Sequence, residues 1–238
     1  MIYKISSRQN EHIKEVFKLY QSGERKLQNK FIIEGFHLLD MALKAKQVVE
    51  VFTLKELNID KTIDQYIVTS EILEKLSKVK NPQGVIAVCK CKSPSKIVGN
   101  KVLYLDDVSD PGNVGTLLRT ALAFGYKDVV LSKNTCSIYN EKVISACQGA
   151  LFELNIVENM PIADLKKDYQ ILATEIKGSV SADEFEPSKK FVLVLGNEAH
   201  GVSKEILALA DKRIRIEIND IESLNVAVAG GIMMYILK

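Results

Sequence analysis

The sequence predicts an α/β protein of two domains, and three observations support this. Predicted strands and helices alternate along the whole chain, which is the pattern of sheets covered by helices. The run 191–195 (Phe-Val-Leu-Val-Leu) is apolar at every position, as in a strand buried on both faces of a parallel sheet. The polar segment 90–96, which contains Pro94, is typical of a linker. We therefore expect domains at 1–97 and 98–238.

The composition indicates a globular protein, with 47% hydrophobic and 26% charged residues in 238. No apolar run approaches 18 residues and no signal-peptide core follows Met1, so we expect a soluble, cytoplasmic protein without membrane contact. The four cysteines lack a C-x-x-C pair, and the three histidines are scattered. This predicts buried thiols and no metal site; the residues are Cys89, Cys91, Cys136, Cys147, His12, His37 and His200.

The charge is uneven although the net charge is only +2. Residues 1–100 hold 17 Lys or Arg and 11 Asp or Glu, hence +6, whereas residues 101–238 hold 15 and 19, hence −4. A basic first part suits a module that contacts the phosphates of a nucleic acid.

The first 97 residues predict a small α/β unit. A helix after Ser6-Ser7 carries an apolar stripe (Ile13, Val16, Phe17, Tyr20), with Lys14 off the stripe and Arg25-Lys26 in a following loop. The remaining predicted elements are strand 30–33, helix 36–45, strand 48–54, a short helix near 63, strand 67–68, helix 71–78 and strand 84–89.

The second part predicts strands 103–105, 128–131, 154–157, 169–174, 191–195 and 214–218, with helices from 113, at 140–150, 163–167, 203–210 and 226–237. The Asp110-Pro111-Gly112 turn leads into the first helix, for which Asn113 is the expected N-cap. In the last helix, small residues such as Gly230 and Gly231 allow another element to come close.

Polar loops follow three of these strands. They carry Asn113 and Arg119, then Glu198, then Ser223 and Asn225. Since ligands of open α/β folds bind at the carboxyl ends of parallel strands, we expect these loops to form one site. Residues 196–201 do not match the G-x-G-x-x-G dinucleotide fingerprint, and Val202 stands where a P-loop needs lysine, which disfavours an NTPase.

Asn113-x-Gly115-x-x-x-Arg119, Gly196-x-Glu198-x-x-Gly201 and Ser223-Leu224-Asn225-Val226, in this order, resemble the three motifs of the SpoU (TrmH) family. These are RNA ribose 2′-O-methyltransferases of the SPOUT superfamily. The resemblance implies S-adenosylmethionine as cofactor, a deep trefoil knot, and a homodimer formed through the catalytic domain. Residues 7–35 are similar to the small ribosomal-protein-like RNA-binding domain that precedes the catalytic domain in many family members.

The resemblance also implies roles for individual residues. Five would be catalytic: Asn113, Arg119, Glu198, Ser223 and Asn225. Seven would contact the cofactor: Thr174, Leu195, Gly196, Gly201, Ile216, Ile218 and Leu224. Four would bind RNA: Lys14, Arg25, Lys26 and Arg119. Because a guanidinium stays protonated at neutral pH, we expect Arg119 to clamp the phosphate beside the target ribose, with Glu198 positioning Arg119 or receiving charge.

The sequence departs from the family pattern at a few positions. Glu217 replaces a usual proline, the loop 216–223 looks one residue shorter, and Ala227 replaces a frequent serine; Ser145 and Cys147 stand where an arginine and a serine often occur. We expect methylation of ribosomal RNA, most readily 23S rRNA. Transfer RNA is the alternative substrate, and a catalytically inactive RNA- or ribosome-binding factor is the alternative function.

Overall fold

The computed structural model describes residues 1–79 and 82–238, which divide into two compact units. The first unit comprises Met1–Ser93 and Tyr139–Ile144, and the second Pro94–Ile138 and Ser145–Lys238. The division predicted at 97 assigned 139–144 to the second part of the chain, whereas these residues group with the first unit.

The first unit contains a mixed five-stranded sheet with strand order β1-β4-β3-β5-β2. β1 and β4, and β4 and β3, are parallel, whereas β5 is antiparallel to β3 and β2. The elements are β1 (Ile2–Ile5), α1 (Glu11–Lys18), α2 (Ser22–Gln28), β2 (Lys30–Glu34), α3 (Phe36–Lys44), β3 (Val48–Thr53), β4 (Asp64–Val68), α4 (Ser70–Leu76) and β5 (Val85–Lys90).

One core of this unit lies between the sheet and helices α1 and α4. It includes Ile13 and Val16 of the predicted helix stripe, together with Phe52, Ile72 and Val88. Phe17 and Tyr20 pack against it while partly exposed, so the predicted stripe is confirmed.

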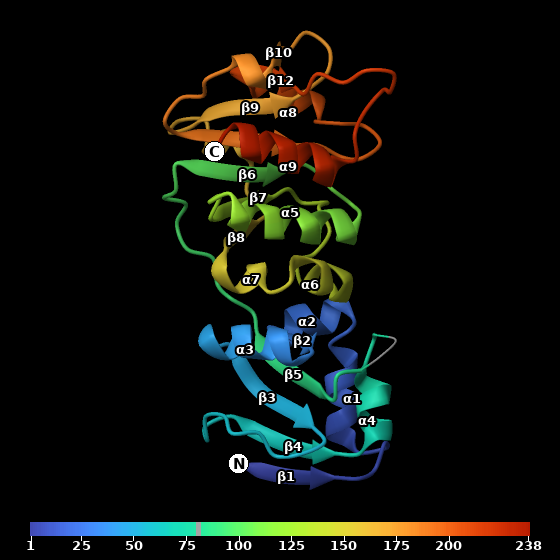
Figure 1. Ribbon diagram of the computed structural model, residues 1–238. Helices are drawn as coiled ribbons and strands as arrows, with labels where there is room; N and C mark the ends of the chain where they lie inside the picture. Colours follow the sequence, from blue (N-terminus) through green and yellow to red (C-terminus); the bar gives the residue numbers. More distant parts are fainter. Residues whose placement is uncertain (80–81) are drawn as a thin grey trace. The chain divides into compact units, whose positions relative to one another are not determined.

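The second unit contains a seven-stranded sheet in which every strand pair is parallel, in the order β10-β12-β9-β11-β6-β7-β8 (Figure 1). Its strands are β6 (Lys101–Leu105), β7 (Asp128–Leu131), β8 (Asn155–Glu158), β9 (Gln170–Thr174), β10 (Val180–Ser181), β11 (Phe191–Leu195) and β12 (Lys212–Arg215). Its helices are α5 (Pro111–Ala123), α6 (Glu141–Cys147, shared with the first unit), α7 (Ala150–Glu153), α8 (Lys204–Leu209) and α9 (Val226–Ile236), with 3₁₀ turns at Ile162–Asp164 and Ala182–Glu184.

Helices cover both faces of this sheet. Alternate residues of β11 face opposite sides: Val192 and Val194 join a core with Ile206 of α8, whereas Leu195 contacts α9. Since all five residues of β11 are buried, the strand predicted to be buried on both faces is confirmed. Helices α5 and α9 lie side by side (Figure 1).

Several predicted helix starts and short elements were wrong, because tertiary contacts or a better N-cap determined where the helices begin. Asp110, not Asn113, caps α5, since its carboxylate accepts the Asn113 N–H (2.8 Å) and Pro111 fits the first helical position. The expected loop at Arg25-Lys26 is helix α2. The expected helix near Ile63 is a turn that leads into β4.

Other elements differ in extent. The predicted helix 140–150 is broken by left-handed Gln148 (φ 50°) and Gly149 (φ 88°) into α6 and α7. The predicted strand 214–218 is β12, which ends at Arg215, and the predicted helix 163–167 is a 3₁₀ turn at Ile162–Asp164. Strands β1 and β10 were missed.

Not all the thiols are buried as expected. Cys89 and Cys147 are buried, whereas Cys91 and Cys136 are partly exposed.

Gly230 decides how closely α9 approaches its neighbours. A Cβ at this position would lie 2.4 Å from Leu117 Cδ2 and 2.6 Å from Leu195 Cδ1, both in buried side chains. At Gly231 the nearest atom would be Thr120 Cγ2, at an ordinary 3.8 Å. The small residues of the last helix therefore allow the close approach that the sequence predicts.

We expect Gly230→Ala to lower the free energy of unfolding by about 1–3 kcal/mol, because an added methyl group overpacks this contact. Gly231→Ala is the matched control and should raise it by up to about 1 kcal/mol through helix propensity. Urea unfolding followed by circular dichroism measures both, and equal effects would contradict the packing argument.

Candidate functional site

Three loops meet at the carboxyl edge of the parallel sheet, as the sequence predicts. They are residues 106–110 after β6, residues 196–203 after β11, and residues 216–225 between β12 and α9. Because β11 pairs with β6 on one side and β9 on the other, the first two loops are neighbours, and the end of β9 lies beside them.

The loop 196–203 is folded tightly on itself. Asn197 and Gly201 exchange two backbone hydrogen bonds (3.0 and 2.9 Å), and Gly201 has φ +68°. A Cβ on Gly196 would lie 2.1 Å from the Gly201 carbonyl carbon and the Val202 nitrogen. Glycine is therefore required at position 196, because the two ends of the loop pass against each other there.

Side chains tie this loop to the one after β6. The Asp106 carboxylate, which is buried, accepts the Ser203 N–H at 2.7 Å. The Asn197 amide donates to the Asp107 carbonyl oxygen at 2.8 Å. Hydrogen bonds from Asn134 and Ser132 hold the pKa of the Asp107 carboxyl below its usual range, so it stays ionised and fixes the turn.

The Glu198 carboxylate accepts four hydrogen bonds. Its Oε2 accepts from the Ser109 N–H and hydroxyl (both 3.1 Å), and its Oε1 accepts from the Asp110 N–H (3.1 Å) and the Asn113 amide (3.0 Å). Partial burial by itself raises the pKa of Glu198, but hydrogen bonds from Asn113, from the Glu198 N–H itself and from the Ser109 and Asp110 N–H groups outweigh it and lower the pKa to about 2. Glu198 is therefore a fixed anion.

The predicted asparagines continue this network. The Asn225 amide donates to Asn113 Oδ1 at 3.0 Å, while Asn225 Oδ1 caps α9 by accepting from Ala227 and Val228 N–H. Asn225 is thus the N-cap of α9. Glu198, Asn113 and Asn225 form one chain of hydrogen bonds from the second motif through the first to the third.

Arg119 lies apart from this network. It is exposed on α5, and its side chain makes no hydrogen bond or ion pair within residues 1–79 and 82–238. The structure therefore does not join Glu198 to Arg119. The carboxylate holds the loop backbone and Asn113 instead.

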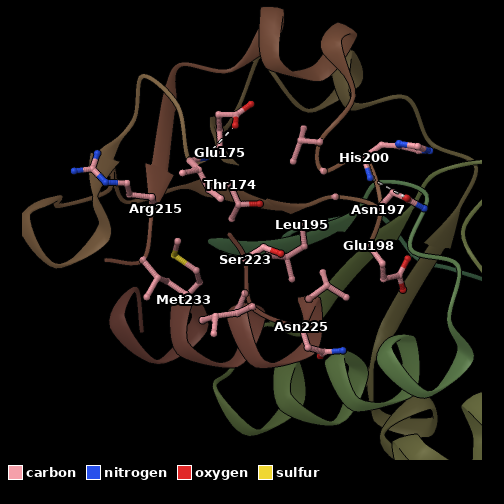
Figure 2. Close-up of a pocket in the computed structure, with 18 of the residues that line it drawn as sticks. Thr174, Glu175, Leu195, Asn197, Glu198, His200, Arg215, Ser223, Asn225 and Met233 are labelled. Carbon is pink, nitrogen blue, oxygen red and sulfur yellow. Dashed lines mark hydrogen bonds between the residues drawn. The ribbon is translucent and has the colours of Figure 1, made fainter. Parts of the chain in front are cut away.

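A cavity of about 450 Å³ lies between the second and third loops. All seven residues expected to contact the cofactor line it, together with Glu198, Ser223 and Asn225, whereas Asn113 and Arg119 do not; the seven are Thr174, Leu195, Gly196, Gly201, Ile216, Ile218 and Leu224. Figure 2 shows Thr174 and Leu195 at strand ends and Met233 on α9, whereas Glu198 of the loop after β11 lies at the side and directs its carboxylate away from them.

Sequence reasoning missed several lining residues, among them Glu175, Asn197, Arg215 and Met233. Asn197 stands between Gly196 and Glu198, so its place in the motif could have indicated it. Arg215 forms an ion pair with Glu217 (2.6 Å), the residue that replaces the family's usual proline.

Of the residues expected to bind RNA, Lys14 and Lys26 are accessible, whereas Arg25 is not. Lys14 pairs with Glu11 at 2.8 Å on the surface of α1, and Lys26 is exposed on α2. The Arg25 side chain is buried and donates to the carbonyl oxygens of Leu19 (3.2 Å) and Tyr20 (2.7 Å). We expected Arg25 in a loop with its charge accessible. This was wrong, because its guanidinium donates hydrogen bonds to carbonyl oxygens at the end of α1.

Metal-binding groups and membrane-spanning helices are both absent from the described part of the chain. Within residues 1–79 and 82–238, no three His, Cys, Asp or Glu side chains are grouped so that they could hold a metal ion. No helix in the same residues has the length and apolar character needed to cross a membrane.

We expect Glu198→Gln to destabilise the second unit, because an amide cannot accept from all four donors. A carboxyl whose pKa falls from 4.5 to about 2 on folding adds stability above pH 4.5 that is lost as the pH falls towards 2. The difference in melting temperature between wild type and variant should therefore be largest near neutral pH and shrink between pH 4.5 and 2. A difference independent of pH would contradict the ionic role.

Comparisons with known proteins identify this arrangement. Residues 100–235 match the model of the SpoU rRNA methylase family, and residues 10–87 match the MRM3-like substrate binding domain. The 23S rRNA (guanosine(2553)-2′-O)-methyltransferase RlmP of Bacillus subtilis is 33% identical over 245 residues, covering 99% of each chain.

Two solved structures are similar over nearly the whole chain. The AdoMet-bound rRNA methyltransferase from Sinorhizobium meliloti has a TM-score of 0.90 at 26% identity, covering 99% of this chain and 97% of that one. A TrmH-family protein from Porphyromonas gingivalis, described as a putative RNA methyltransferase, has a TM-score of 0.85 at 27% identity, covering 94% and 95%. The first motif is joined by hydrogen bonds to the second and third motifs, which line the cavity, and the chain belongs to the SpoU rRNA methylase family.

Proposed function

We propose that this protein transfers the methyl group of S-adenosylmethionine to a ribose 2′-OH of 23S ribosomal RNA. The observation that carries the proposal is a cavity at the sheet edge, lined by all seven expected cofactor residues and bordered by the Glu198–Asn113–Asn225 network. The name of the Bacillus subtilis relative, a 23S rRNA 2′-O-methyltransferase, supports the choice of substrate.

The cavity fits S-adenosylmethionine. Its volume lies within the usual range for small-molecule sites. Aliphatic side chains such as Ile216, Ile218 and Leu224 suit the adenine ring, and the exposed loop segment 198–201 suits its polar atoms. When bound, the cofactor supplies an electrophilic methyl group on a sulfonium centre.

The chain's own residues would position the ribose. Each of the Asn113 and Asn225 amide groups has one N–H engaged in the network, which leaves a second N–H to donate to a ribose oxygen. Glu198 keeps both asparagines in place as a fixed anion. Arg119, exposed and without an ion pair in the described part of the chain, would clamp the phosphate beside the target ribose.

The two domains would have different functions. We propose residues 98–238 as the catalytic domain, with the deep trefoil knot that the family resemblance implies. Residues 1–97 would bind RNA, with Lys14 and Lys26 facing phosphate. The match of residues 10–87 to a substrate binding domain supports this. We also propose that the protein acts in the cytoplasm, which the bacterial 23S rRNA methyltransferase among its relatives supports.

The catalytic domain would form a homodimer through α5 and α9. A groove on these helices is lined by Asn113 and Asn225 and by apolar residues. Val228 and Tyr235 in it are 52% and 56% exposed, which is costly for apolar surface in a lone chain. A partner there would bring the network asparagines close to the second subunit.

The proposal is tested by calorimetric titration with S-adenosylhomocysteine, the stable product. We expect micromolar binding with one site per subunit and much weaker binding of ATP. Labelled methyl transfer should then occur to 23S rRNA and not to tRNA. No binding at millimolar ligand would contradict the proposal and favour an inactive RNA-binding factor, and transfer to tRNA alone would overturn the substrate.

Arg119→Ala should reduce methyl transfer by about 10²–10³-fold while leaving S-adenosylhomocysteine affinity unchanged, because Arg119 does not line the cavity. Arg213→Ala, which removes an exposed arginine of β12, is the matched control and should retain activity. Near-normal turnover of Arg119→Ala would remove this residue from the mechanism.

A further inference from the structure

Three aromatic rings are stacked across neighbouring strands of the first unit. Tyr3 of β1 pairs in register with Tyr66 of β4, which pairs with Phe52 of β3. The Tyr3 and Tyr66 ring centroids are 5.0 Å apart with an interplanar angle of 18°, and those of Tyr66 and Phe52 are 4.9 Å apart at 11°. The three rings therefore form one nearly parallel row on the same face of the sheet.

This row runs from the core to the surface. Phe52 is fully buried, Tyr66 is partly buried, and Tyr3 is 36% exposed. β1 is at the edge of the sheet, so the row ends in a ring that reaches solvent. Because Tyr3 is accessible and two further rings are stacked behind it, its ring offers a rigid, flat apolar surface.

A fourth ring lies beside the row. The His12 ring of α1 is 4.7 Å from that of Tyr66 and 5.7 Å from that of Phe52. Its Nε2 lies 2.7 Å from Glu50 Oε2, and this carboxylate is only 8% exposed, whereas the His12 side chain is 37% exposed. The buried carboxylate fixes the ring in place before any ligand arrives.

The groups around the row keep the Tyr66 ring uncharged, and cationic residues for an RNA phosphate are present in the adjoining turn. Burial, followed by the negative charges of Glu50 and Asp64, raises the pKa of Tyr66 to about 12, so its hydroxyl stays neutral. Arg8 is exposed in the turn that follows β1, and Lys75 donates to its carbonyl oxygen at 2.6 Å. Two cationic residues thus lie in or against the turn between Tyr3 and His12.

We propose that Tyr3, backed by Tyr66, whose ring His12 in turn contacts, stacks on an unpaired base of the RNA substrate. Proteins commonly bind single-stranded RNA by stacking bases on aromatic side chains, and every base offers a face for this. The rigid row lowers the entropic cost of the contact, because the rings are already ordered. This inference rests on the proposed function only in taking RNA as the substrate.

A fluorescence experiment tests the contact directly. The chain contains no tryptophan, so Tyr3→Trp introduces a single reporter in the full-length protein. Ile2→Trp is the matched control, since Ile2 is 50% exposed and, as the adjacent strand residue, faces the opposite side of the sheet. Oligouridine and oligoadenosine should quench the fluorescence of Tyr3→Trp and not that of Ile2→Trp, and a blunt RNA duplex should quench neither. Equal responses of the two variants, or none, would overturn the proposal.

Affinity measurements separate stacking from charge. Tyr3→Ala should weaken binding of single-stranded RNA by about 5- to 100-fold, whereas Tyr3→Phe and Ile2→Ala should leave it nearly unchanged. Because no phosphate contact is removed, the dependence of Kd on salt should be the same in Tyr3→Ala as in wild type. A smaller salt dependence, or loss of affinity in Tyr3→Phe as well, would overturn stacking. Thermal unfolding of each variant shows whether the domain remains folded.

The outcome is independent of the test of methyl transfer. If wild type methylates rRNA and Tyr3→Ala binds RNA with full affinity, the stacking surface is wrong and the proposed function stands. If the fluorescence and affinity results hold but wild type neither binds S-adenosylhomocysteine nor methylates RNA, the stacking surface stands and the proposed methyl transfer is wrong.

Discussion

The Glu198 carboxylate is the contact on which the rest of the site depends. It accepts four hydrogen bonds from the loop after β6 and from the start of α5, and so joins segments that lie 85 or more residues apart in the sequence. Through Asn113 it reaches Asn225, which caps α9. One ionised side chain thus sets the relative positions of all three motifs. An acidic residue in such a place resembles a catalytic base, but a carboxylate with a pKa of about 2 holds protons too weakly for that role.

The cavity exists because the parallel sheet brings strand ends together. β9, β11 and β12 end at the same edge, so their loops enclose one space, and helices on both faces of the sheet leave that edge open. Two segments come very close to their neighbours here, the chain at Gly196 and helix α9 at Gly230. Neither position has room for a side chain. Close backbone packing at these two glycines therefore contributes to the shape of the site beside the Glu198 contacts.

The first unit uses its charged and aromatic residues differently from what their types suggest. Arg25 is a basic residue in a basic part of the chain, yet it is buried and satisfies carbonyl oxygens at the end of α1. Tyr3 lies in a strand that the sequence pattern did not reveal, and yet its ring is the accessible end of an ordered row. For an RNA-binding surface, position in the fold matters more than the count of lysines and arginines.

The sequence by itself determined the alternation of strands and helices, the strand buried on both faces and the three motif loops, because these depend on local apolar patterns and on residues close together in the chain. All seven residues that the family resemblance implied as cofactor contacts line the cavity, but Glu175, Asn197, Arg215 and Met233, which also line it, were missed. Only the tertiary structure decided that Asp110 and not Asn113 caps α5, that Arg25 is buried, and that β1 is a strand. A cap depends on which of two nearby side chains reaches the free N–H groups, and an edge strand of four residues forms only when a distant strand supplies its hydrogen bonds. The role of Glu198 was likewise decided by donors from the other loop, which no pattern around residue 198 could specify.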